Sequence, residues 1–246
     1  MGRIILVLSF IVGCAFGLSP LNRSGLVAFY PMTQQTGNVL LDTKGGDKLV
    51  GVSNPYIKNA SAYTDGTASY YEATNQLALK SLTNKVSCSF WCKRNTTTSA
   101  GLITCVDLGV PIGIWNVQNT ATGQFQMVII AAPTTTTGLA TGTSYTSAGV
   151  WRHFVGVYDG TQSTAANRIK LYVNGVDVSG GLTPTGTIPT ALQNPANTTF
   201  RIGKGTGAAL GDSYIKFLEI YNRPLTPTEV KNIYVEKYNK VNQSQQ

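Results

Sequence analysis

The stretch that decides the fold is RIKLYVNG, residues 168–175, in which apolar and polar residues alternate before an Asn-Gly pair. Strict alternation predicts a strand with one buried face, and Asn-Gly is the strongest short-range signal of a hairpin turn. Upstream, residues 153–158 (HFVGVY) form another β-type run, which ends at an Asp-Gly turn. Similar short runs separated by turns extend from residue 25 to residue 221 and do not alternate with long helices. This pattern predicts an all-β, two-sheet antiparallel sandwich.

The composition supports this fold class and excludes several others. Only 12% of the 246 residues are charged, about half the usual share, while 42% are hydrophobic. Disordered chains need low hydrophobicity and high charge, and long exposed helices need many Glu, Lys and Arg residues. The net charge is +8, but the longest basic run is only Lys93-Arg94. Because a nucleic-acid interface needs clustered cations, we expect no nucleic-acid partner.

One short helix is predicted near the C-terminus. Residues 226–229 (TPTE) form a capping box with proline at the first helical position. Its apolar face would comprise Val230, Ile233, Tyr234, Val235 and Tyr238. We expect one domain over residues 24–238 and a tail over residues 239–246.

Residues 1–18 form a hydrophobic leader or membrane anchor. The apolar run of residues 4–18 follows Arg3 and is shorter than the ~20 residues of a spanning helix. Three interpretations stay open: a signal peptide cut at Leu18, a lipobox that would acylate Cys14, or a retained membrane anchor. Cys88, Cys92 and Cys105 are odd in number and are interpreted as buried free thiols, although Cys92 and Cys105 could face each other across a hairpin.

The order of several motifs carries a family resemblance. These motifs are residues 25–30 (GLVAFY), 86–93 (VSCSFWCK), 151–160 (WRHFVGVYDG), 171–175 (LYVNG), 201–203 (RIG) and 219–230 (EIYNRPLTPTEV). In this order they resemble the laminin-G-like jelly roll of the concanavalin A-like lectin/glucanase superfamily. The resemblance implies a jelly-roll sandwich with Trp151 and His153 on a core strand. It does not imply one function, because this fold hosts lectins, adhesion modules, glycosidases and structural proteins.

The resemblance also suggests where ions and ligands could bind. Asp42 and Asp47 lie in an early turn where related domains sometimes bind calcium, so calcium is the one cofactor considered. Relatives commonly carry an acidic pair after the isoleucine at position 215, but this chain has Lys216-Phe217. A carboxylate for a cation is therefore missing there. Trp115 and Asn116, expected in a turn, combine a stacking ring with an amide and are the candidate sugar-binding residues.

Catalytic residues are not evident in the sequence. The glucanases of this superfamily place carboxylates on one strand as Glu-x-Asp-x-x-Glu, and no such run occurs. The closest acidic spacings are Asp42/Asp47 and Asp212/Glu219, and His153 is the only histidine. We therefore expect no enzyme, and a glycoside hydrolase is the least favoured alternative.

The favoured function is a non-catalytic structural or interaction module of a surface assembly, such as a minor capsid or membrane-associated protein of a virus particle. Its partners would be other proteins of that assembly, the membrane through residues 4–18, and glycans. It would then be membrane-associated or part of a virion. The alternative is an exported, glycan-binding lectin-like protein or surface lipoprotein at the cell surface.

Overall fold

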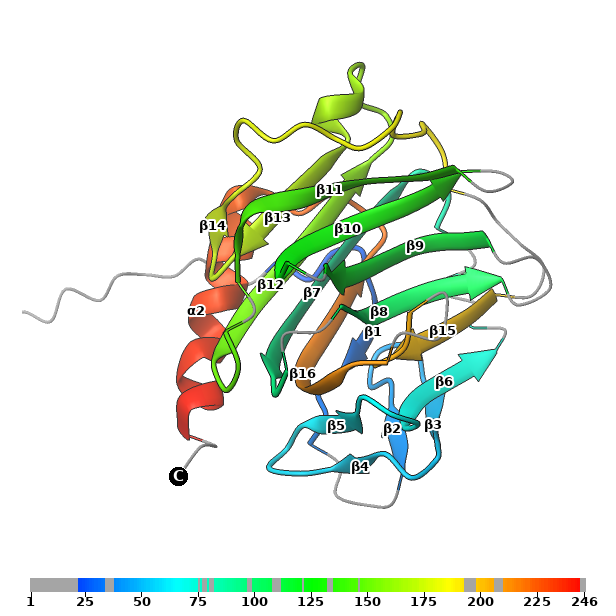
Figure 1. The fold of residues 1–246 in the computed structure, drawn as a ribbon, viewed down its shortest axis with the longest axis vertical. Helices are drawn as coiled ribbons and strands as arrows, with labels where there is room; N and C mark the ends of the chain where they lie inside the picture. The colour runs from blue at the N-terminus through cyan, green and yellow to red at the C-terminus, as the bar shows by residue number, and fades with distance from the viewer. Residues whose placement is uncertain are drawn as a thin grey trace, which may run out of the picture.

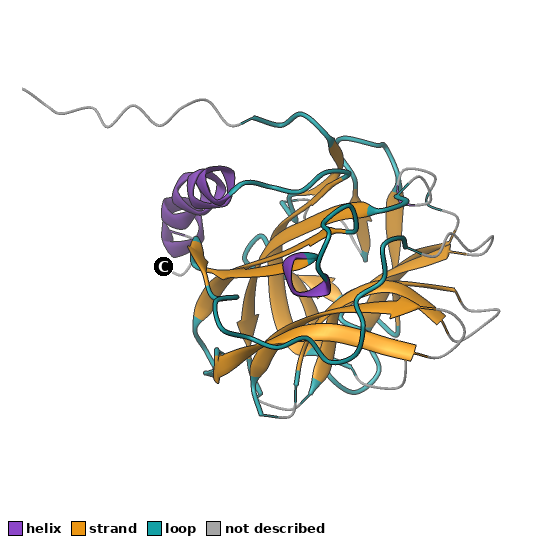
Figure 2. Cartoon of the chain, turned by 90° about the horizontal axis from the view of Figure 1, so that it is seen from above, coloured by secondary structure: helices purple, strands orange, loops and turns teal. Residues whose placement is uncertain are grey.

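The computed structural model describes residues 22–33, 38–74, 76, 79, 82–96, 99–107, 112–120, 122–131, 135–145, 147–192, 198–205 and 210–243. They form two antiparallel sheets that pack face to face, with one helix against the outside of one sheet (Figures 1 and 2). The predicted all-β sandwich with one C-terminal helix is confirmed.

Sheet A carries the helix on its outer face. Its strands follow the order β14 (Val176–Asp177), β13 (Ile169–Val173), β12 (Trp151–Asp159), β7 (Lys85–Arg94), β16 (Asp212–Tyr221), β5 (Ala62–Asp65) and β4 (Tyr56–Ile57). Strand β1 (Leu26–Tyr30) also pairs with β16. Residues 168–175 form β13 and its turn, in which Asn174 and Gly175 both have positive φ, as a tight hairpin requires.

Sheet B closes the other side of the core. Its strands follow the order β11 (Thr135–Ser144), β10 (Gln124–Ala131), β9 (Ile112–Asn119), β8 (Ala100–Asp107), β15 (Thr198–Ile202), β6 (Tyr70–Thr74), β3 (Lys48–Val52) and β2 (Val39–Leu41). A short 3₁₀ turn, η1 (Ala165–Asn167), precedes β13. Aromatic rings from both sheets meet in the core: the Phe125 and Phe154 centroids are 4.6 Å apart.

Two local expectations are corrected. The hairpin across which Cys92 and Cys105 could have faced each other does not form, because β7 and β8 lie in different sheets. Alternation gives each strand a buried face but does not choose its partner. The composition of the threonine run at residues 134–137 predicts a polar loop, but residues 135–137 begin β11. There the Thr137 hydroxyl donates a 2.8 Å hydrogen bond to the carbonyl of Ile129, so polar side chains are accommodated within the strand.

The cysteines behave as the sequence predicts. Cys88, Cys92 and Cys105 are free and buried. Cys92 lies in sheet A and Cys105 in sheet B, so the two do not face each other across a hairpin. Cys14 and the other residues expected to form a leader or anchor, 1–18, lie outside the described residues. Within the described part of the chain, no helix is long and apolar enough to cross a membrane.

Helix α2 (Pro227–Gln243) packs on the outer face of sheet A. Its capping box is confirmed: the amide of Glu229 donates to Thr226 Oγ1 at 3.3 Å, and the amide of Thr226 donates to Glu229 Oε2 at 2.9 Å. The ring of Tyr234 stacks on Trp91 with centroids 5.5 Å apart. This contact explains why Trp91 interrupts the polar side of its strand. The helix continues to Gln243, beyond the expected start of the tail at residue 239.

An ion-pair network holds the first described residues against α2. Arg23 Nη1 lies 2.7 Å from Glu219 Oε1, and the hydroxyl of Tyr221 donates to Glu219 Oε2 at 2.8 Å. Arg23 also reaches Glu236 of α2 at 3.3 Å. The Glu219 side chain is fully buried, so these contacts compensate a charge that has no access to water.

Candidate functional site

The two residues expected to bind a sugar do not share one surface. Trp115 lies inside strand β9 rather than in a turn, and it is fully buried against Phe200. Neighbouring residues of a strand point to opposite faces, so Asn116 faces away from the core that holds Trp115. An indole with no exposed surface cannot stack on a sugar, and the structure therefore places Trp115 in the core. Asn116 is also buried, at 2% exposed, and hydrogen-bonds Gln118 at 3.2 Å.

Asp42 and Asp47 do lie together, but Asp42 already has a structural role. Its Oδ1 accepts hydrogen bonds from the amides of Phe29 and Lys44 at 2.9 and 2.8 Å, whereas its buried Oδ2 has no partner among the described residues. Burial, with the nearby charge of Asp42, raises the pKa of Asp47. Calcium requires six to eight oxygen ligands, and no group of three His, Cys, Asp or Glu side chains able to hold a metal occurs in the described ranges. These residues do not complete a calcium shell, and calcium binding here stays a prediction.

The structure brings together one pair that resembles catalytic machinery. The hydroxyl of Ser89 lies 2.9 Å from His153 Nε2. Both residues are buried, and His153 Nδ1 has no hydrogen-bond partner in the described part of the chain. Burial lowers the pKa of His153 to about 3, which makes the imidazole a weak base. A nucleophile needs a base that is oriented by a third group and that is open to substrate, and this pair offers neither.

The acidic pair Asp212/Glu219 is divided between the two ends of β16. Asp212 accepts a 2.6 Å hydrogen bond from Asn95, and Glu219 is held by Arg23 and Tyr221. Each carboxylate thus has its own structural partners.

A row of large side chains crosses five strands on the outer face of sheet A. Cross-strand pairing places Tyr56, Tyr63, Tyr214, Lys93 and Trp151 side by side on β4, β5, β16, β7 and β12. The tyrosine rings are in contact, with centroids 4.9 and 4.7 Å apart. The Lys93 ammonium follows, 4.7 Å from the Tyr214 ring and 5.6 Å from the Trp151 ring.

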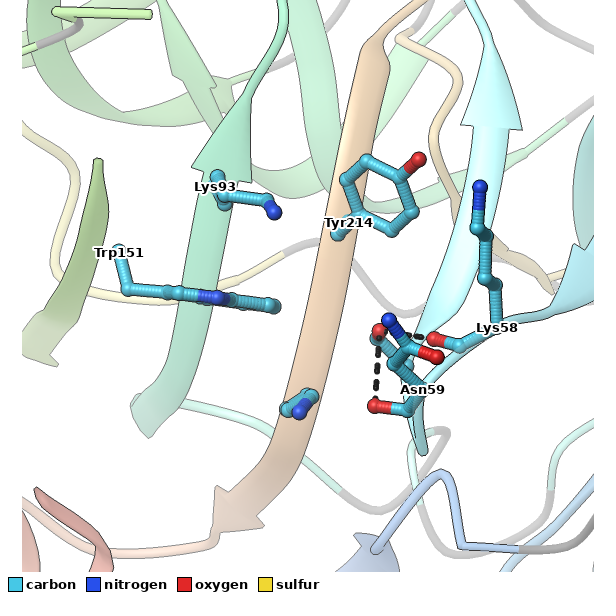
Figure 3. A pocket seen from close by; sticks show the side chains of 7 residues that line it. Lys58, Asn59, Lys93, Trp151 and Tyr214 are labelled. Atoms are coloured by element: carbon cyan, nitrogen blue, oxygen red, sulfur yellow. Dashed lines mark hydrogen bonds between the residues drawn. The ribbon is translucent and has the colours of Figure 1, made fainter. Parts of the chain in front are cut away.

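The end of this row borders a cavity of about 230 Å³ that we call the lysine pocket. It is lined by Lys58, Asn59, Ser61, Lys93, Trp151, Tyr214 and Lys216. Figure 3 shows the Trp151 indole lying across β7 towards β16, with Lys93 and Tyr214 beside it and Lys58 and Asn59 opposite. Three lining residues are cationic and none is acidic.

The wall opposite Trp151 is a tight turn between β4 and β5. The backbones of Lys58 and Ser61 exchange hydrogen bonds of 2.9 and 3.0 Å, and Asn59 and Ala60 both have positive φ. The Ser61 hydroxyl also donates to the carbonyls of Lys58 and Asn59 (Figure 3). These contacts hold this wall of the pocket in one conformation before any ligand arrives.

Lys216 lies two residues after Tyr214 and therefore shares the outer face of β16 with it, just before a bulge in that strand. Its pairing with β7 shifts between Lys216 and Glu219, and Phe217 has φ of 50°. Positive φ is unusual for a bulky residue, and the bulge interrupts the alternation of β16 after Lys216. Lys216 is only 2% exposed and its ammonium lies 5.0 Å from the Trp151 ring. Burial, together with the nearby charge of Lys93, lowers the pKa of Lys216 to about 8.

This arrangement is suited to an anion that also carries a ring. Two ammonium groups, those of Lys93 and Lys216, lie near one indole, and repulsion between them is relieved when a negative ligand enters. This site could not be found from the sequence, because its residues come from three strands and a turn that lie far apart in the chain. The one available signal was the departure at position 216, where a lysine replaces the expected acidic residue.

Comparisons with known proteins agree with the fold. A family model described as the concanavalin A-like lectin/glucanases superfamily matches residues 65–231. No curated protein matches this sequence. Among solved structures, Trypanosoma rangeli sialidase in complex with sialic acid is similar with a TM-score of 0.63 and 15% identity, over 89% of this chain and 34% of the sialidase chain.

Two bacterial toxin structures are similar to the same extent. The receptor binding domain of botulinum neurotoxin C/D mosaic serotype has a TM-score of 0.63 and 14% identity, over 88% of this chain and 52% of the toxin chain. The binding domain of botulinum neurotoxin DC in complex with rat synaptotagmin II has a TM-score of 0.60 and 13% identity, over 86% and 51% of the two chains. This chain thus spans about a third to a half of the length of these structures, and the low identities indicate a shared fold alone.

Proposed function

This chain belongs to the concanavalin A-like lectin/glucanases superfamily, and from that premise we propose that it is a non-catalytic binding module for acidic glycans. The observation that carries the proposal is the lysine pocket, where the ammonium groups of Lys93 and Lys216 lie 5.6 and 5.0 Å from the ring of Trp151. Sugars bind proteins through ring stacking together with a few polar contacts, and charge-assisted hydrogen bonds to an acid group add affinity. Asn59 adds an amide side chain at the same pocket.

The free-energy cost of burying a charged lysine supports a binding role for the lysine pocket. Keeping Lys216 buried beside Lys93 disfavours its charged form, as its lowered pKa indicates. A purely structural position could hold an apolar residue without this cost. Binding sites often retain such unfavourable features because the ligand compensates them.

Titration calorimetry with acidic and neutral glycans tests the proposal. We expect 3′-sialyllactose or a hyaluronan tetrasaccharide to bind, and lactose to bind much more weakly. Lys216→Met should weaken binding of the acidic glycan about tenfold, because it removes one charge-assisted hydrogen bond. Lys170→Met is the matched control, since Lys170 lies on β13 of the same sheet but does not line the lysine pocket. Equal binding of acidic and neutral glycans, or no binding of either, would refute the proposal.

A second proposal concerns where the module works. We infer from the hydrophobic residues 4–18 that it serves a surface assembly, either as a membrane-associated or virion protein or as an exported surface protein. Mass spectrometry of the mature N-terminus separates these cases. A chain that starts at Leu18, or one with an acylated Cys14, supports export, whereas an intact Met1 supports a retained anchor.

A further inference from the structure

Trp151 borders a second cavity as well as the lysine pocket. This cavity, of about 440 Å³, lies between the start of β12 and α2, and we call it the helix-side cavity. Its lining includes Trp91, Val150, Trp151, Tyr234, Tyr238 and Asn242. Trp151 is the one residue that lines both cavities, so they lie next to each other on the outer face of sheet A.

The chemistry of the helix-side cavity differs from that of the lysine pocket. It contains no lysine and no acidic residue, and its surface is formed by aromatic rings and amide side chains. Tyr238 is 44% exposed and its ring packs against Tyr234, with centroids 5.5 Å apart. The one cation, Arg152, donates hydrogen bonds to the carbonyl of Tyr145 at 2.6 Å and to Ser147 Oγ at 3.2 Å. Its guanidinium therefore already has partners within the protein.

The rim of the helix-side cavity is held in place by the backbone. The amide of Gly149 donates a 2.7 Å hydrogen bond to the carbonyl of Arg94 at the end of β7. Gly149 has φ of +77°, a conformation that favours glycine. On the other side, Asn174 is fixed through a 2.9 Å hydrogen bond from the amide of His153. A cavity with a fixed rim loses little entropy when it binds a ligand.

We propose that the two cavities are adjoining subsites for one linear acidic oligosaccharide, an inference that rests on the proposed function. The acidic sugar occupies the lysine pocket, and the neighbouring neutral sugar crosses Trp151 to lie against Tyr238 in the helix-side cavity. The orientation of the oligosaccharide follows from the charges, because the lysines line only the cavity on one side of Trp151. Together the cavities fall within the range of about 300–1,000 Å³ that is typical of ligand sites.

Calorimetry with ligands of different length tests the second subsite. The probes are N-acetylneuraminic acid against 3′-sialyllactose, and glucuronic acid against a hyaluronan tetrasaccharide. We expect at least one oligosaccharide to bind about tenfold more tightly than its free acid. Tyr238→Ala should remove this gain and leave the affinity for the free acid unchanged, while Tyr238→Phe should retain it. Val235→Ala is the control on the same helix, since Val235 is 37% exposed and lines neither cavity.

The outcomes separate this inference from the proposed function. If acid and oligosaccharide bind equally and both depend on Lys216, the second subsite is refuted while the acidic-glycan function stands. If Tyr238→Ala weakens the free acid as much as the oligosaccharide, the two cavities do not act as separate subsites, and the inference also fails. If none of the four probes binds, the proposed function itself is overturned and this inference falls with it.

Discussion

Replacing Lys216 with methionine should change how the stability of the protein depends on pH. In the folded chain this ammonium lies in the lysine pocket, 5.0 Å from the Trp151 ring and 2% exposed. Burial and the nearby charge of Lys93 lower its pKa from 10.5 to about 8. Methionine has a similar length, keeps an apolar contact with the indole and carries no charge.

The direction of the effect follows from proton binding. Between pH 8 and pH 10.5 the unfolded chain keeps a proton on Lys216 that the folded chain has released. Unfolding therefore takes up a proton, so the free energy of unfolding rises as pH increases through this window. The two pKa values correspond to a gain of about 1 kcal/mol between pH 7 and pH 9.

Urea denaturation at pH 7 and at pH 9 measures this gain. The free energy of unfolding of the native chain, relative to that of Lys216→Met, should increase by about 1 kcal/mol over the interval. Lys170→Met, outside the lysine pocket, should follow the native chain in its pH dependence. Stability curves of the native chain and Lys216→Met that run parallel between these pH values would show that Lys216 is not held in an unfavourable charged state.

Three further predictions test other parts of the fold. Burial lowers the pKa of His153 to about 3, so below pH 6.5 the unfolded chain binds a proton that the folded chain does not. The free energy of unfolding should therefore fall by about 1 kcal/mol per pH unit as pH decreases from 6.5. In denaturation experiments at pH 4–6.5, the free energy of unfolding of His153→Asn should fall less steeply than that of the native chain. Arg23→Ala should cost about 2 kcal/mol in a denaturation experiment, because it removes the 2.7 Å ion pair of the buried Glu219; an unchanged midpoint would contradict this role. The described cysteines are buried: Cys88, Cys92 and Cys105. Burial raises the pKa of each thiol, to about 12 for Cys92. A thiol reagent should therefore react with these three cysteines only after denaturation.

Much of the fold could be predicted because the relevant signals are local. Alternation in residues 168–175, the Asn-Gly turn and the TPTE capping box each depend on a few neighbouring residues, and all three predicted the observed element. Which strands pair with each other was harder to predict, as the separation of β7 and β8 into different sheets shows. Each strand exposes the same hydrogen-bonding groups whichever neighbour it has, so alternation alone leaves that choice open.

For the candidate site, too, the sequence supplied residue types but not their arrangement in space. The sequence proposed Trp115 as a stacking ring, because aromatic residues serve that role, but it could not show that the ring points into the core. It also showed that a lysine occupies position 216, where an acidic residue was expected.

The sequence by itself therefore determined the fold class, the helix and the absence of the glucanase carboxylate pattern, since composition and short-range periodicity carry these properties. Only the tertiary structure decided that Lys93, Trp151 and Lys216 meet in one pocket. Their strands are joined by hydrogen bonds between distant parts of the chain, and β16 pairs with β7 in one register from Ser213 to Lys216. The lowered pKa of Lys216 arises from that burial and that neighbour, and neither is encoded by the residues next to it in the chain.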